Sequence, residues 1–122
     1  SEALAEMGRY NDQLINAGVL LAAEGLQSSA KGHRVKFSKS GQVVTDGPFS
    51  ETKELLAGFW LIDVKSRQEA LAWAKKIPFR DGEEVEVRQV FEAADFPVDS
   101  VSEEHLVKEQ AWRDANQKPI TR

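Results

Sequence analysis

The sequence predicts a single α+β domain whose helices pack on one face of an antiparallel sheet. Apolar residues recur at three- and four-residue spacing in some segments, as on the buried side of a helix, and alternate or run together in others, as in strands. Glycine and proline mark the boundaries between these segments. The 122 residues fit one domain of common size.

The first half of the chain predicts a helix, a strand and a hairpin. Val19–Leu26 is an apolar strand, and His33–Phe37 and Gln42–Thr45 form a hairpin through a short polar connection. Before them, apolar residues at helical spacing begin the chain, and Gly18 stops that helix. The residues that recur there are Ala3, Met7, Tyr10, Leu14 and Ala17.

The second half predicts a strand, a helix and a further strand. Gly58–Val64 is apolar on both faces, which is typical of a central strand covered on both sides. Ser66 and Glu69 form a capping box that opens a helix, and Pro78 ends it. Glu84–Phe91 alternates apolar and polar residues and predicts a half-buried strand.

A sharp corner joins the two halves. Asp46 ends an apolar run, Gly47 frees the backbone, and Pro48 fixes the next φ. Residues 50–56 then predict a helical turn. An acid at such a corner either caps its own turn or faces a cavity and handles protons, and both alternatives stay open.

The order helix, strand, hairpin, strand, helix, strand matches a ferredoxin-like fold that lacks its first strand. We expect an apolar segment of roughly six to eight residues before Ser1 to supply that strand. Residues 1–97 form the predicted domain, and 98–122 form a polar tail that is helical over Ser102–Ala115. In that tail, Leu106 and Trp112 predict docking on the body or on a partner subunit.

Composition excludes several classes of function. Twenty acidic and sixteen basic residues give a net charge of −4, which argues against direct nucleic-acid binding. The absence of cysteine excludes disulfides, thiolate metal sites and a cysteine nucleophile, and it fits a cytoplasmic protein. His33 and His105 are isolated and predicted on the surface, so we expect no metal site and no cofactor. No stretch has the length and apolarity of a membrane helix.

The candidate site gathers around Asp46, the candidate catalytic residue. Glu24 interrupts an apolar strand, Arg88 is a natural counter-charge or anion anchor, and Tyr10 could reach the same cavity from the first helix. Trp60 would cover the cavity or a subunit interface. A structural hydrogen-bond network around the corner is the alternative interpretation of the same residues.

Several short motifs follow one another over about residues 4–95. They are Gly8-Arg9-Tyr10-Asn11, Ala17-Gly18-Val19-Leu20, Glu24-Gly25-Leu26, Val43, Thr45-Asp46-Gly47-Pro48-Phe49, Glu51-Thr52-Lys53-Glu54, Gly58-Phe59-Trp60, Ala70, Ala74 and Glu86-Val87-Arg88. With them the sequence resembles the YCII-related superfamily, and specifically its DGPF branch. The resemblance implies a homodimeric ferredoxin-like α+β barrel, in which two sheets enclose a cavity, and it implies the missing first strand.

The resemblance leaves two functions open. Some family members are encoded beside, or fused to, extracytoplasmic-function sigma factors, which implies a small-ligand-binding or regulatory role with a sigma-factor partner. Others are enzymes with a histidine–aspartate pair, including dehydrochlorinase-like members that act on hydroxylated aromatics. Asp46 matches the acid of that pair. Its histidine would fall between Met7 and Tyr10, where this sequence has none, and this departure favours the regulatory role.

Overall fold

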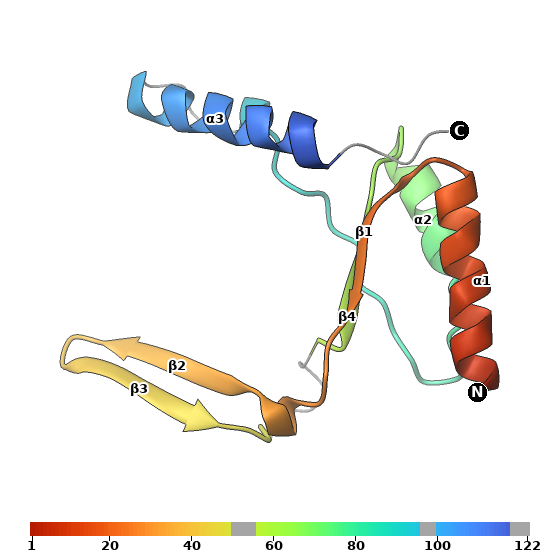
Figure 1. Ribbon diagram of the computed structural model, residues 1–122, viewed down its shortest axis with the longest axis horizontal. Helices are drawn as coiled ribbons and strands as arrows, with labels where there is room; N and C mark the ends of the chain where they lie inside the picture. Colours follow the sequence, from red (N-terminus) through yellow and green to blue (C-terminus); the bar gives the residue numbers. More distant parts are fainter. Residues whose placement is uncertain (50–55, 96–99, 118–122) are drawn as a thin grey trace. The chain divides into compact units, whose positions relative to one another are not determined.

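The computed structural model describes residues 1–49, 56–95 and 100–117. Its elements form a small α+β fold in which β1 pairs with β4 and β2 pairs with β3 (Figure 1). The α+β class is therefore confirmed, while the dimeric barrel and the additional first strand stay predictions. In chain order the elements are α1 (Glu2–Asn16), β1 (Leu20–Gly25), η1 (Ser29–Lys31), β2 (His33–Ser38), β3 (Gly41–Asp46), β4 (Gly58–Ile62), α2 (Arg67–Lys75), η3 (Ala93–Asp95) and α3 (Ser100–Asn116).

The chain divides into two units. Residues 1–22 and 61–122 make up one, here called the helical unit, and residues 23–60 make up the other, here called the hairpin unit. The helical unit contains α1, α2 and α3, and the hairpin unit contains η1, β2 and β3. No helix in the described ranges combines the length and the apolar character needed to cross a membrane.

The buried core lies where α1 turns into β1. Leu14 is fully buried, and Tyr10, Val19 and Leu20 are each less than a tenth exposed. The helix ends at Asn16, Gly18 follows with a φ of 75°, and the Val19 amide then donates to the Leu14 carbonyl at 3.2 Å. This tight return brings the first strand back against the helix that precedes it.

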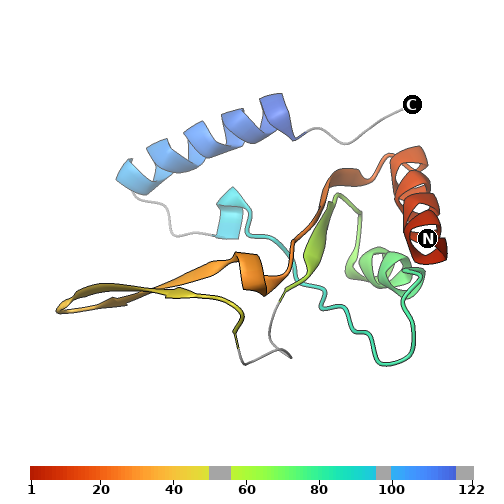
Figure 2. The same cartoon turned by 60° about the horizontal axis from the view of Figure 1, so that its bottom comes forward.

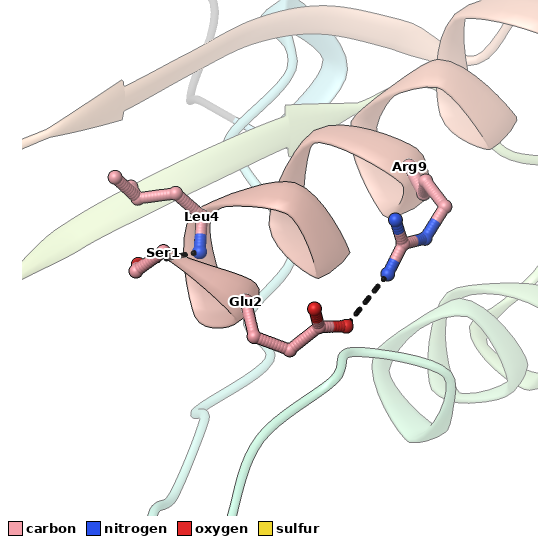
Figure 3. A network of polar contacts seen from close by, with 4 residues as sticks. All are labelled: Ser1, Glu2, Leu4 and Arg9. Atoms are coloured by element: carbon pink, nitrogen blue, oxygen red, sulfur yellow. Dashed lines mark hydrogen bonds and ion pairs between the residues drawn. The ribbon is translucent and has the colours of Figure 1, made fainter.

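The N-terminal end of α1 has its own polar contacts, which Figure 3 shows. The Ser1 hydroxyl accepts from the Leu4 amide at 3.4 Å, and Arg9 meets the Glu2 carboxylate at 3.3 Å. Both ends of that ion pair are mostly exposed, so it contributes little to stability.

Helix α2 lies beside α1, as both views show (Figures 1 and 2). The Tyr10 hydroxyl donates to the Trp73 carbonyl at 2.8 Å, and the two rings meet edge to face with centroids 6.5 Å apart. The predicted cap is present, because the Ser66 hydroxyl accepts from the Glu69 amide at 3.1 Å. The Glu69 carboxylate, however, accepts from the Lys65 amide at 2.9 Å instead of returning to Ser66.

One predicted strand is wrong, and another is only partly tested. Strand β4 pairs with β1 in a two-stranded sheet of the described residues, and Phe59 is half exposed, so a central position for β4 stays a prediction together with the additional first strand. Residues 83–92 form neither helix nor strand, so the predicted strand Glu84–Phe91 is wrong. Its alternating pattern is real, but a strand also needs a neighbour that completes its hydrogen-bond ladder, and alternation does not supply one.

The tail is helical, as predicted, and α3 extends the expected span by two residues at its start and one at its end. Ion pairs one turn apart support this helix, Glu104–Lys108 and Glu109–Arg113, each at 3.6 Å. Trp112 is 59% exposed, so the expectation that it docks on a partner stays a prediction. The helical turn predicted over residues 50–56 lies, except for its last residue, in the range 50–55, outside the described residues. The predicted boundary between domain and tail at residue 97 lies in the range 96–99, also outside them.

Candidate functional site

The hairpin of β2 and β3 is the element that brings polar side chains together. The strands pair antiparallel from His33 opposite Asp46 to Ser38 opposite Gly41. At the tip, the Ser38 hydroxyl donates to the Gly41 carbonyl at 2.9 Å and lies 3.1 Å from the Ser40 hydroxyl. The connection is therefore short and internally bonded, and it fixes the register of the whole ribbon.

At the open end of the hairpin, His33 and Asp46 form a hydrogen-bonded pair. His33 Nδ1 lies 2.7 Å from Asp46 Oδ1. An ionised carboxylate only accepts hydrogen bonds, so this contact with an ionised Asp46 requires the tautomer that carries its proton on Nδ1. The Nε2 nitrogen of a neutral ring then keeps its lone pair, which leaves it able to take a proton from another molecule. The side chains are 63% and 82% exposed.

The register also decides what lies beside the pair. Residues two apart on a strand, and residues directly opposite across the ladder, share one face of the ribbon. Val35 and Val44 lie opposite each other as the next pair along that face, and Phe37 follows. All three are exposed, at 48%, 63% and 71%. An uncovered apolar strip therefore continues directly from the His33–Asp46 pair.

The other face of the same ribbon has a different character. Arg34 and Lys36 alternate with the residues of the apolar face, and they lie opposite Thr45 and Val43. The Arg34 guanidinium also stacks over the Phe49 ring, 4.1 Å from its centroid. This cation–π contact holds the chain just beyond the Asp-Gly-Pro corner against β2.

The structure places Asp46 against His33 rather than against Glu24. Glu24 is exposed on β1, and the described contacts of Asp46 do not include it. Arg88 is exposed and meets the Glu86 carboxylate at 3.4 Å. Arg88 belongs to the helical unit and Asp46 to the hairpin unit, so the expected approach of these two residues stays a prediction.

Two of the candidate site residues, Tyr10 and Trp60, are aromatic. Tyr10 is buried between α1 and α2, where desolvation raises the pKa of its hydroxyl. Its hydroxyl donates to the Trp73 carbonyl, and the residue also lines a shallow surface depression with Arg9 and Lys76, so its role as a ligand-binding residue stays a prediction. Trp60 is half-buried on β4.

His33 is the site residue that the sequence interpretation missed. Its surface position was expected correctly, but its pairing with Asp46 was not. The signal was present in the sequence, because the two hairpin strands and their connection had been recognised. Folding them about Lys39 and Ser40 places His33 opposite Asp46. The histidine beside Asp46 therefore comes from β2, whereas the first helix has none between Met7 and Tyr10.

The described residues contain no cluster of three or more potential metal ligands. His105 lies exposed on α3. The chemistry that the described residues bring together is that of an imidazole hydrogen-bonded to a carboxylate beside an apolar strip.

Comparison with known proteins agrees with the motif pattern of the chain. Residues 1–94 match the model of the YCII-related domain. An uncharacterized protein of Rhizobium meliloti (strain 1021) is 34% identical over 74 residues, which are 61% of this chain. The match spans 60% of the length of that relative.

Proposed function

The chain belongs to the YCII-related family, and from that premise we propose that its His33–Asp46 pair transfers a proton on a small organic substrate. The observation that carries this proposal is the 2.7 Å contact between Nδ1 and Oδ1. Pairs of this kind recur where a histidine acts as general base, because the carboxylate fixes both the tautomer and the orientation of the ring.

The proposed step begins with neutral His33 and ionised Asp46. Nε2 takes a proton from the substrate, so the electron pair of the broken bond stays on the substrate and the ring becomes an imidazolium. Asp46 stabilises that positive charge through the Nδ1 hydrogen bond without itself becoming protonated. The proton returns from Nε2 to the substrate or its product, which restores the pair.

The apolar strip beside the pair favours a substrate that has both an acidic proton and an apolar group. A molecule with an acidic proton next to an alkyl or aryl group would place the proton at Nε2 and the apolar group over Val35, Val44 and Phe37. Such contacts would remove apolar surface from water, which favours binding by roughly 25 cal/mol per Å².

A second copy of the chain would complete this site. Catalysis by a general base is most effective where water is excluded, yet the pair is largely exposed in one chain. We therefore include a homodimer, formed through exposed apolar sheet surface, in the proposal. Light scattering is expected to give twice the chain mass at micromolar concentration. A monomer at that concentration would overturn this part of the proposal.

The catalytic test uses proton exchange, because it needs no knowledge of the natural product. Small ketones, thioesters and phenylacetate esters are incubated with the protein in deuterated water, and NMR follows the loss of their acidic C–H protons. Removing a positioned general base is expected to slow exchange by about 10²–10⁴-fold, in His33→Ala and in Asp46→Asn. His105→Ala, which changes the other histidine, is the matched control and should retain the full rate.

Ligand binding without turnover is the second candidate, favoured by the wide exposure of the pair to water. In that case one of the same compounds would raise the melting temperature in a His33-dependent way while no exchange occurs. A regulatory role would in addition require capture of a sigma factor from cells that encode one beside this chain. Equal exchange by the unaltered protein, His33→Ala and Asp46→Asn would overturn the catalytic proposal.

A further inference from the structure

The chain makes a tight turn immediately before the hairpin. The Ser28 hydroxyl accepts from the Ala30 amide at 3.2 Å, and its carbonyl accepts from the Lys31 amide at 3.0 Å. The Gly32 amide closes the turn by donating to the Ser29 carbonyl at 2.9 Å. These bonds define η1 as a compact platform that ends at Lys31, with Gly32 alone between it and His33.

Gly47 lies directly on this platform. A Cβ atom added to Gly47 would stand 1.7 Å from the Ser29 carbonyl oxygen and 2.7 Å from the Ser29 carbonyl carbon. Both of those atoms belong to the backbone, so they cannot move aside as a flexible side chain would. The Gly47 amide also donates to the Gly32 carbonyl at 2.9 Å, which extends the ladder one step beyond His33 and Asp46.

The two residues joined by that last bond are the chain neighbours of the pair. Gly32 precedes His33, and Gly47 follows Asp46. Every residue of both strands is exposed, so apart from the pair itself and the Arg34–Phe49 contact the described bonds at this end of the ribbon are backbone bonds. A separation of the strands here would open the Nδ1–Oδ1 contact, and a one-residue slip would move His33 and Asp46 to opposite faces.

We propose that Gly47, resting on the turn Ser29–Lys31, is the positioning residue that holds the His33–Asp46 hydrogen bond closed. This inference rests on the proposed function, which explains why the hydrogen bond should be held closed. Its test does not depend on that function. Gly47 can take this role because it has no side chain: only a hydrogen atom fits between its Cα and the Ser29 carbonyl.

The test measures the His33 ring by long-range ¹H–¹⁵N NMR, which distinguishes the two neutral tautomers from the nitrogen couplings of the ring protons. The unaltered protein should show Nδ1–H as the dominant neutral form. Gly47→Ala should lose that preference to the same extent as Asp46→Asn. Gly58→Ala is the matched control, because a Cβ there would also meet backbone, 2.6 Å from the Glu24 carbonyl oxygen, but away from the hairpin. It should leave the tautomer unchanged.

A milder pair of variants keeps the proposal testable if Gly47→Ala does not fold. Ser28→Ala removes the hydroxyl that caps η1 and should reduce the Nδ1–H preference, whereas Ser28→Thr retains the hydroxyl and should restore it. An unchanged tautomer in Gly47→Ala or in Ser28→Ala would overturn the inference. The measurement requires no turnover, so a failure of the proposed catalysis would leave its outcome unaffected.

Discussion

Different interactions stabilise the layer formed by α1 and α2 and the hairpin formed by β2 and β3. The buried residues Tyr10 and Leu14 lie on α1, and the Tyr10 hydroxyl joins that helix to α2. Every residue of β2 and β3 is exposed. Side-chain burial therefore stabilises the helical layer, whereas the hairpin keeps its shape through backbone bonds and its terminal turn. Substitutions in the two regions should consequently change different properties.

Leu14→Ala should give the largest loss of stability. Leu14 is fully buried, and truncating a buried leucine costs about 2–5 kcal/mol through lost transfer energy and the cavity left behind. Denaturant melts followed by circular dichroism measure the change. Leu4→Ala is the control on the same helix, because Leu4 is 75% exposed and should change the free energy of unfolding by less than about 0.5 kcal/mol. Equal losses in both variants would contradict the division between core and surface.

Ser66→Ala should have a smaller effect in the same layer. The Ser66 hydroxyl satisfies the Glu69 amide at the start of α2, and loss of such a cap costs about 1 kcal/mol. Ser66→Asp keeps an oxygen acceptor and should retain most of the stability. The comparison fails if the alanine and aspartate variants unfold at the same denaturant concentration.

Tyr10→Phe should cost about 1 kcal/mol, because it leaves the Trp73 carbonyl without its hydroxyl donor. The substitution should also change how stability depends on pH. Burial raises the pKa of Tyr10 above the ordinary value of 10.0, so the unfolded chain releases this proton first as pH rises. The stabilisation is complete below pH 10 and declines as pH rises from 10 through the folded-state pKa. Tyr10→Phe removes this contribution, and stability curves measured between pH 8 and pH 11 should show a shallower decline.

Asp46→Asn should have the smallest effect on stability. Its ion pair with His33 is exposed at both ends, and such pairs contribute from about 0 to 1 kcal/mol. We expect a change below about 0.5 kcal/mol, measured by the same melts, together with loss of the proposed proton exchange. A loss near 1 kcal/mol with unchanged exchange would instead identify Asp46 as a cap of its own turn.

Local sequence signals predicted the elements whose bonds are themselves local. Helical spacing and Gly18 placed α1 within one residue of its observed end, and Ser66 with Glu69 located the start of α2. The hairpin was also predicted, because both strands and their connection lie within a few residues of one another. These patterns are sufficient because each element supplies its own hydrogen-bond partners.

Signals that depend on distant partners were less informative. Glu84–Phe91 alternates like a strand, yet Val85 and Val87 are 42% exposed and no ladder forms there within the described residues. Neither histidine was assigned a role because each is isolated in the sequence, and only the register of the ribbon shows that His33 faces Asp46. Extending that register from the turn to the ends of both strands would have found the pair.

The charge pattern of the hairpin has a consequence for the kinetics of encounter. Residues 33–46 contain Arg34, Lys36 and Lys39 against a single acid, Asp46, in a chain whose net charge is −4. A locally positive ribbon in an acidic protein attracts small anions toward itself from beyond contact distance. This long-range attraction weakens as salt shortens the screening length, which is about 10 Å at 0.1 M. Added salt should therefore slow the arrival of an anionic ligand at the hairpin while leaving any proton transfer after its arrival unchanged.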